Sequence, residues 1–595
     1  MSASLSEIEH LGAAVRKHGV DFRVWAPNAE RVSVVGSFND WRSDANPLER
    51  DDGGYWFGHV ASASAGDEYR YDIDFNGETF SRVDPHARAL TDSKGNAVVT
   101  DTRFDWDDDD FTPAPLNELV LYELHIGTFN AENGHGTLRS AIDRLPHLRS
   151  LGVNGVTLMP ITEFVGDTGW GYDMAHLYAV EASYGGPAAF KEFVKAAHRE
   201  GIAVMLDMVY NHLGFEDNLL WRFDGWHEGK GGGIYFFQDP ERGDTPWGPR
   251  PDYSRPQVRD YILGNALMWL DEYRLDGLRV DGTFHMRSAS KTETGSYTPL
   301  PGGWSLLREL TETIRAKFPK KFVIAEDMRE DPVVVRSVAE GGAGFHAQWS
   351  DRITHAARMP ADRKDLPELV KTFREILEAK YSDDSMQRVI FSESHDNAGK
   401  DGRIPDAVNP QDPESEESIR RSLLAAAIVF TAPGVPQVFQ GQEVLETRYF
   451  DIWNPPPLEL SWADKFGGVL RFFQDVIALR RNKNGNTAGL TGPHINVFHQ
   501  NDDAGVLAWH RYKDGGPGDD VIVVANFSSD TLSSYELALP LRGTWRVLLD
   551  SGSAEYDPQK SRRTAERNVA AVFPSGEKIE IAPGPRCVVV LGRDD

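Results

Sequence analysis

The 595-residue sequence has a single cysteine, Cys587, so it cannot form an internal disulfide bond. We expect this residue to be a small buried hydrophobe in the apolar run CVVVLG. Long apolar runs are also missing. The most apolar stretch, residues 423–439, is interrupted by two prolines and a glycine and is too broken to span a bilayer. Residues 1–19 lack the apolar segment of a secretory signal, so we expect a cytoplasmic protein.

Positive charge is scarce. The chain has 63 Lys and Arg against 91 Asp and Glu, a formal net charge of −28. Nucleic acids and anionic membranes are therefore disfavoured as partners, because both carry negative charge themselves. We interpret the acidity as a means of maintaining solubility, and composition gives no expectation about the oligomeric state. With 40% hydrophobic and 11% aromatic residues, the chain has the material for a large globular core.

The hydrophobic pattern changes twice along the chain. Period-two alternation in runs such as VDFRVWAP and EYRYDIDF predicts an N-terminal β-sandwich over residues 1–112. The same period returns in DVIVVANFS and neighbouring runs, which predicts a C-terminal β-sandwich over residues 489–595. The acidic stretch FDWDDDDF (104–111) follows the first sandwich. We interpret it as a solvated linker rather than a calcium-binding or protein-binding segment.

Residues 113–488 alternate short apolar runs with amphipathic helical segments, a pattern typical of a parallel sheet with crossover helices. The runs lie at residues 119–127, 153–161, 202–210, 275–282, 321–327, 345–351, 387–396 and 435–443. Eight such units predict a (β/α)8 barrel with a short insertion after the third strand, at about 211–260. An open doubly wound sheet is the alternative.

The fourth run, RLDGLRVDG (274–282), carries charged residues inside an otherwise apolar strand, which is costly unless they are paired. Arg279 and Asp281 are two positions apart and so point to one face of the strand, and we expect Gly282 to leave room for a ligand. A structural ion pair is the simpler explanation. Polar residues also follow other runs: Asp207, Asn211, His212, Glu326, Asp327, Glu393, His395, Asp396, Gln440, Gln442 and Glu443. Since barrel enzymes hold their chemistry at the C-terminal strand ends, we predict several carboxylates around one barrel mouth.

Four short motifs occur in order: DMVYNH (207–212), LDGLRVDGTFHM (275–286), VIAED (323–327) and FSESHDN (391–397). Together they resemble the four motifs of the α-amylase superfamily, glycoside hydrolase family 13. The resemblance extends over nearly the whole chain, because the front sandwich with FNDW (38–41) looks like the family's early-set carbohydrate-binding module and the end looks like its C-terminal sandwich. It implies a retaining enzyme that acts on α-glucans.

The resemblance also implies roles for single residues. Asp281 matches the nucleophile, Glu326 the general acid/base, and Asp396 the third carboxylate, which binds sugar hydroxyls and stabilises the transition state. The residues matched to substrate binding and support of the pocket are Tyr172, Asp207, His212, Arg279, His285 and His395. No cofactor is expected. Asn211 matches a calcium ligand of some relatives, but no clear carboxylate cage follows it, so we assign no metal ligands and the binding of calcium stays open.

Simpler explanations stay open for several of these residues. Tyr172 and Trp170 can be core aromatics, Asp207 can serve only to brace Arg279, and His285 can be a surface histidine. Glu393 and Glu443 fit either substrate contact or the barrel rim.

The resemblance leaves open which group accepts the cleaved glucan segment, a sugar hydroxyl or water. GSFNDW, SESHDN and the segment before the barrel favour a 1,4-α-glucan branching enzyme, whereas DMVYNH and GWGYDMAHLY look closer to maltooligosyltrehalose trehalohydrolases. We predict branching of an α-1,4-glucan or maltooligosaccharide substrate, with trehalohydrolase or α-amylase-like hydrolysis as the alternative. A noncatalytic glucan-binding protein is disfavoured, because all three matched carboxylates are present.

Overall fold

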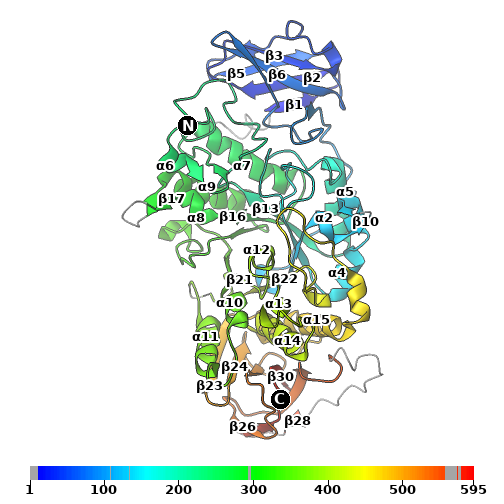
Figure 1. Cartoon of the computed structure of the whole chain (residues 1–595), viewed down its shortest axis with the longest axis vertical. Coiled ribbons are helices and arrows are strands. Elements are labelled where there is room, and N and C mark those ends of the chain that lie inside the picture. The colour runs from blue at the N-terminus through cyan, green and yellow to red at the C-terminus, as the bar shows by residue number, and fades with distance from the viewer. Residues whose placement is uncertain are drawn as a thin grey trace.

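The computed structural model describes residues 11–107, 109–132, 134–291, 297–382, 384–556, 572–573 and 578–595. Three parts follow one another along the long axis of the molecule: an N-terminal β-domain, a central barrel and a C-terminal β-domain (Figure 1). The order agrees with the two changes of hydrophobic period along the sequence.

The N-terminal domain has two antiparallel sheets. One contains β1 (Gly12–Val15), β2 (Val20–Trp25), β5 (Tyr55–Val60) and β4 (Glu49–Arg50); the other contains β3 (Arg31–Gly36), β6 (Glu68–Phe75), β7 (Glu78–Arg82) and β8 (Ala97–Val98). Alternation in β6 explains the packing, because Tyr69, Tyr71 and Ile73 are fully buried and the residues between them are not. The predicted N-terminal sandwich is confirmed.

The central sheet is a closed parallel barrel in the order β12-β13-β16-β19-β20-β21-β22-β9. Its strands are β9 (Leu121–Leu124), β12 (Gly155–Leu158), β13 (Ala203–Val209), β16 (Gly277–Asp281), β19 (Phe322–Ala325), β20 (Ala347–Ser350), β21 (Arg388–Ile390) and β22 (Val435–Phe439). Each predicted apolar run contains one strand, and closure of the sheet rules out the open alternative. The C-terminal strand ends therefore surround one mouth.

Helices surround the barrel. They are α2 (Ile126–Phe129), α3 (Leu138–Ile142), α4 (Leu145–Leu151), α5 (Gly186–Arg199), α6 (Pro240–Gly243), α7 (Pro256–Asp271), α8 (Thr283–Arg287), α9 (Pro301–Lys317), α10 (Arg352–Arg358), α11 (Leu366–Glu378), α12 (His395–Lys400), α13 (Ile404–Val408), α14 (Glu416–Thr431) and α15 (Gly467–Arg480). In α5 the buried residues Phe190, Phe193, Val194 and Ala197 recur at helical spacing and form one apolar face. None of the helices in the described part of the chain has the length and hydropathy needed to cross a membrane.

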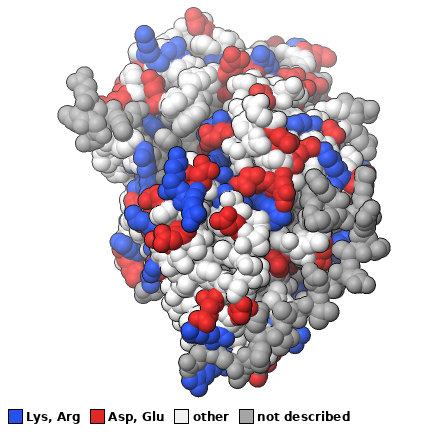
Figure 2. All heavy atoms as spheres, turned by 60° about the horizontal axis from the view of Figure 1, so that its bottom comes forward, with Lys and Arg blue, Asp and Glu red and all other residues white. Residues whose placement is uncertain are grey.

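The C-terminal domain is all-β, as predicted. A six-stranded sheet contains β23 (His494–Asn501), β24 (Val506–Tyr512), β25 (Val521–Asn526), β30 (Cys587–Arg593), β27 (Trp545–Asp550) and β28 (Val572–Phe573), and a pair contains β26 (Tyr535–Ala538) and β29 (Lys578–Ile581). Cys587 is fully buried in β30. On the face shown in Figure 2, acidic and basic side chains lie side by side, so the net negative charge is not gathered there into one acidic patch.

Three buried arginines hold the 431–434 turn that leads into the last barrel strand. Their side chains donate to three carbonyls of this turn: Arg511 to residue 431 at 2.7 Å, Arg388 to residue 433 at 2.9 Å and Arg480 to residue 434 at 3.0 Å. Backbone carbonyls that are buried need such donors. The segment that leads into β22 is therefore held at the end of the barrel opposite the mouth.

The acidic stretch 104–111 keeps Asp105, Asp107 and Asp110 exposed, as expected of a solvated linker, but it also has charged partners. Asp107 pairs with Lys195 at 2.7 Å and Arg199 at 2.6 Å, and Asp109 lies 2.9 Å from the His198 ring. The three basic residues sit on one face of α5, at helical spacing, and meet the acidic run there. The segment is docked on the barrel. Residue 108 is outside the described residues.

Candidate active site

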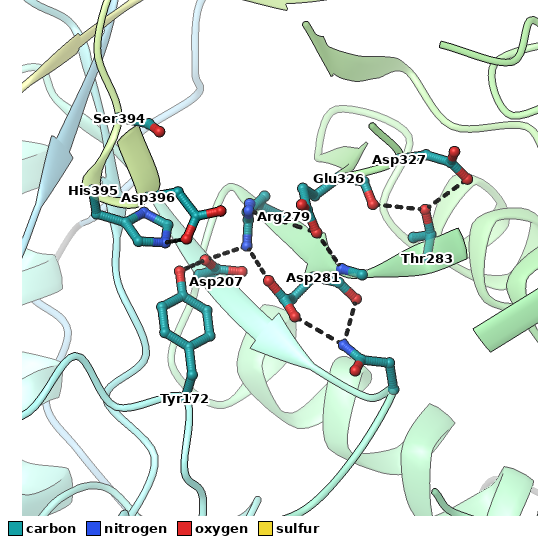
Figure 3. Close-up of polar contacts among 12 residues, drawn as sticks. Tyr172, Asp207, Arg279, Asp281, Thr283, Glu326, Asp327, Ser394, His395 and Asp396 are labelled. Carbon is teal, nitrogen blue, oxygen red and sulfur yellow. Dashed lines mark hydrogen bonds and ion pairs between the residues drawn. The ribbon is translucent and has the colours of Figure 1, made fainter. Parts of the chain in front are cut away.

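Three adjacent strands place charged side chains at the barrel mouth. In the β13–β16 register Asp207 lies opposite Arg279, and in the β16–β19 register Val280 lies opposite the last residue of β19, directly before Glu326. Asp281 ends β16. Because parallel strands that are in register end at the same edge, the side chains of Asp207, Asp281 and Glu326 converge around Arg279 (Figure 3).

Arg279 is the centre of this cluster. Its Nη1 lies 2.5 Å from Asp207 Oδ2 and 2.8 Å from Asp281 Oδ1, and its Nη2 lies 3.9 Å from Glu326 Oε2. The guanidinium sits over the Trp349 ring at 4.1 Å, and the residue is only 2% exposed. A planar cation can serve several carboxylates and an aromatic face at once. One buried positive charge therefore faces three carboxyl groups.

Both carboxylate oxygens of Asp281 have a donor. Arg279 holds Oδ1, and the Asn211 amide donates to Oδ2 at 2.8 Å and to the Asp281 backbone oxygen at 3.0 Å. Gly282 has a positive φ of 53°, and a Cβ on it would lie 2.6 Å from the Asn211 amide nitrogen. The expectation that Gly282 leaves room for a ligand is therefore corrected: the glycine makes room for Asn211.

Glu326 is held differently from Asp281. Its Oε2 accepts a hydrogen bond of 2.5 Å from the Gly282 backbone N–H. Burial raises the pKa of Glu326 to about 8, and the Asp281 charge adds to this while Arg279 opposes it. Burial likewise raises the pKa of Asp207 to about 6, against the effect of Arg279. At neutral pH Glu326 therefore carries a proton beside a carboxylate that is held by two donors.

Asp396 and His395 reach the site from a helix. The predicted strand run 387–396 is too long, because β21 ends at Ile390 and α12 begins at His395. The Ser394 side chain caps α12 by accepting from the Asn397 backbone N–H, which satisfies a donor of the first turn. The acidic side chain in that first turn is Asp396, where the helix dipole stabilises negative charge.

A second charged group forms around His395. Its Nδ1 lies 2.6 Å from Glu123 Oε1 on β9, and its Nε2 lies 3.7 Å from Asp396 Oδ1. Burial alone lowers the pKa of His395, but the Glu123 carboxylate outweighs it and raises the pKa above its ordinary value. Burial alone raises the pKa of Asp396, but the charges of His395 and Lys400 lower it; Lys400 Nζ lies 2.9 Å away.

Tyr172 and His212 belong to the same cluster. The Tyr172 hydroxyl donates to Asp207 Oδ2 at 2.6 Å, and its ring stacks on His395 with centroids 5.1 Å apart. His212 Nδ1 lies 2.6 Å from the Asn211 amide oxygen, and burial lowers the pKa of His212 to about 4. His212 is therefore neutral at pH 7. Trp170, by contrast, is only 4% exposed and is a packing residue.

His285 lies at the edge of the site, on α8. Its ring centroid is 4.9 Å from that of Trp247, which is 47% exposed and also lies 5.7 Å from the His212 ring. Burial lowers the pKa of His285, and the Arg250 charge adds to this. The Trp247 ring therefore contacts both His212 and His285, which follow different barrel strands.

Two glutamates that the sequence left open are structural. Glu393 accepts from Arg403 at 3.2 Å, and Glu443 accepts from the Tyr122 hydroxyl at 2.9 Å; both are buried. Within the described ranges, no three His, Cys, Asp or Glu side chains are grouped as a metal site.

Sequence reasoning missed four residues that hold the cluster: Glu123, Asn211 as a partner of Asp281, Trp349 and Lys400. Glu123 carried the same signal as Arg279, a charged residue inside an apolar strand run. No pattern in the sequence pointed to Trp349 or Lys400.

Replacing Glu326 with glutamine should stabilise the protein at alkaline pH. The raised pKa means that the folded state keeps a proton that the unfolded state, with an ordinary value of 4.5, has lost. Wild-type stability therefore falls as pH rises from about 4.5 through about 8, whereas glutamine cannot ionise. In urea unfolding at about pH 9, Glu326→Gln should exceed wild type by more than about 1 kcal/mol, with little difference near pH 4.5. The exposed Glu312→Gln on α9 is the control, and equal effects at both pH values would contradict the buried proton.

Comparison with known families and structures assigns the three parts of the chain to known domain families. Residues 10–87 match the family model "Carbohydrate-binding module 48 (Isoamylase N-terminal domain)", residues 91–247 and 244–456 match "Alpha amylase, catalytic domain", and residues 497–594 match "Alpha amylase, C-terminal all-beta domain". A solved structure, the putative alpha amylase from Salmonella typhimurium, superposes with a TM-score of 0.73 over 98% of this chain and 100% of that one, at 23% identity.

Two curated relatives are similar over most of their length. The chain is 29% identical over 582 residues to 1,4-alpha-glucan branching enzyme GlgB of Salinibacter ruber, which covers 92% of this chain and 90% of that protein. It is 31% identical over 478 residues to malto-oligosyltrehalose trehalohydrolase of Saccharolobus solfataricus, covering 75% and 78%. Since the catalytic-domain match extends over more than half of the sequence, this chain belongs to the α-amylase superfamily, glycoside hydrolase family 13.

Proposed function

We propose that this protein is a retaining α-glucan-acting enzyme in which Asp281 is the nucleophile and Glu326 the general acid/base. One observation carries the proposal. Two carboxyl groups on neighbouring strand ends face the same arginine, and one of them has its pKa raised to about 8 by burial while the other accepts hydrogen bonds from two side chains. A protonated acid beside a negatively charged carboxylate is what glycoside cleavage with retention requires.

In the first step Asp281 attacks the anomeric carbon of the sugar. The bond from that carbon to the bridging oxygen breaks, and the oxygen takes the proton from Glu326 as the first fragment departs. A glycosyl ester on Asp281 remains, and Glu326 is ionised. Arg279 stays beside both carboxyl groups, so the positive charge is present while negative charge moves from one to the other.

In the second step a hydroxyl group attacks the same carbon. It gives its proton to Glu326 while the ester bond to Asp281 breaks, which restores both groups. A 6-hydroxyl of a glucan chain gives an α-1,6 branch, and water gives hydrolysis. The two outcomes differ only in the acceptor.

The other clustered residues have supporting roles in this proposal. Asp396 binds sugar hydroxyls, and His395 and His212 contact the sugar at the reacting position. Tyr172 offers its ring to an apolar sugar face and also braces Asp207, which in turn holds Arg279. Asp207 therefore supports the pocket by bracing Arg279, so the simpler explanation given for this residue and its proposed role coincide.

His285 is proposed to contact the departing fragment. Its position on α8, the helix that directly follows the strand of Asp281, supports this assignment. The exposed Trp247 beside it offers an aromatic surface on the same side.

We propose that the group that accepts the transferred glucan segment is a glucan 6-hydroxyl, so that the protein is a 1,4-α-glucan branching enzyme. The similarity to the Salinibacter ruber enzyme over 92% of this chain, including the N-terminal module, supports this choice. Water is the second candidate acceptor, because the Saccharolobus solfataricus trehalohydrolase is 31% identical over 75% of the chain.

The Glu326→Gln variant should separate the acid step from the rest. It cannot protonate a departing sugar, so activity on amylose should fall by about three orders of magnitude or more. On α-maltosyl fluoride, whose leaving group needs no proton, the first step should proceed. Rates of fluoride release and of amylose turnover provide the comparison. An equal loss on both substrates would remove Glu326 from the acid role.

Branching should be visible in the product. Wild-type protein incubated with amylose should give new α-1,6 anomeric proton signals, and the chain-length profile should change after debranching. Asp281→Asn, which nearly keeps the shape of the side chain but removes its charge, should give neither product. If reducing ends rise without α-1,6 signals, the acceptor is water and the branching proposal fails; trehalose released from maltooligosyltrehalose would identify the second candidate.

A further inference from the structure

We propose that Tyr449, Ile452 and Trp453, here called the 449–453 platform, bind the part of an α-1,4-glucan that stays on the enzyme after cleavage. The inference rests on the proposed retaining cleavage and adds a subsite to it. It concerns the loop that follows the last barrel strand, β22, and its ligand is the sugar chain on the nucleophile side of the cut bond.

The platform is an exposed apolar surface. Tyr449 is 51% exposed, Ile452 42% and Trp453 60%, all within five residues. Large apolar side chains gathered at the surface indicate a binding function rather than folding stability. Sugar rings present apolar C–H faces, and aromatic rings in exposed positions give them a flat, weakly hydrated surface.

The platform is held rigidly, which a binding surface needs. Phe450 is buried and stacks on Trp170 with centroids 5.8 Å apart, and its backbone N–H donates to residue 398 at 3.1 Å. The Trp170 backbone N–H donates to the Ile452 carbonyl at 3.1 Å, and the Thr168 hydroxyl donates to the Trp453 carbonyl at 3.1 Å. The side chains are therefore presented without a large loss of loop entropy on binding.

These contacts join the platform to one side of the active site. The Tyr449 hydroxyl donates to the Gly399 carbonyl, in the same helix as Asp396. Trp170, whose backbone holds the platform, packs on the His395 ring at 5.0 Å. The platform is thus continuous with the part of the site that contains His395 and Asp396.

The direction of the sugar chain follows from the position of the acid. In Figure 3, Tyr172 and the α12 residues lie on one side of Arg279 and Asp281, and Glu326 lies on the other. The departing fragment receives its proton from Glu326, so it leaves on that side, toward α8. The retained fragment must then extend past Tyr172 and α12, which leads to the 449–453 platform.

Glycosyl fluorides of two lengths test the platform, because fluoride departs on the Glu326 side and every sugar lies on the retained side. We compare kcat/KM for α-maltosyl and α-maltohexaosyl fluoride in the full-length protein. Trp453→Ala should lose about tenfold on the longer fluoride, the equivalent of about 1.4 kcal/mol, and little on the shorter one. Tyr535→Ala, which removes a partly exposed aromatic from β26 of the C-terminal domain, is the control and should change neither value.

The remaining outcomes separate failure of the platform from failure of the proposed function. Equal losses on both fluorides, or no loss on the longer one, overturn the platform. If wild type releases no fluoride at all, the proposed function fails, and the platform is then tested without turnover: maltohexaose binding to the Asp281→Asn protein, measured by calorimetry, should weaken about tenfold when Trp453→Ala is added. Unchanged maltohexaose binding there overturns the platform separately.

Discussion

The buried charge of Arg279 is the constraint on which the rest of the site depends. A guanidinium that is 2% exposed is tolerable only with close anionic partners, and Asp207 and Asp281 supply them at 2.5 and 2.8 Å. These partners stand on adjacent strands, so the pairing needs the register of β13 against β16. Closure of the barrel keeps this register, and Trp349 covers the guanidinium from within.

The two carboxyl groups beside the fixed cation are held in different ways. Asp281 lies against Arg279 and Asn211, whereas Glu326 is 3.9 Å from the same arginine and accepts its short hydrogen bond from a backbone N–H. Burial then raises the pKa of Glu326 to about 8. Glu326 thus keeps its proton because of its burial and the neighbouring Asp281 charge, which together outweigh the effect of Arg279. Retaining glycoside chemistry depends on this difference between the two carboxyl groups.

Much of the fold was predictable, because apolar period and length distinguish barrel strands from sandwich strands. The placement of Arg279 and Asp281 was predictable too, since charged residues in a core strand are costly unless they are paired. The contacts that complete the site were not, because they join residues far apart in sequence: Glu123 on β9 meets His395, which follows β21 two strands away around the barrel, and Trp349 covers Arg279. The docking of the acidic stretch 104–111 was not predictable for the same reason, since its partners are basic residues of α5.

The central claim is that Asp281, held by Arg279, is the residue that becomes covalently bonded to the sugar. The most direct measurement is mass spectrometry of peptides from Glu326→Gln protein quenched in acid during reaction with α-maltosyl fluoride, when the missing base slows release of the ester. We predict a maltosyl mass increase on the peptide that contains Asp281 and fragmentation that assigns it to this residue. Fluoride release with an unmodified Asp281, or a label on Asp396 or Asp207, would contradict the account.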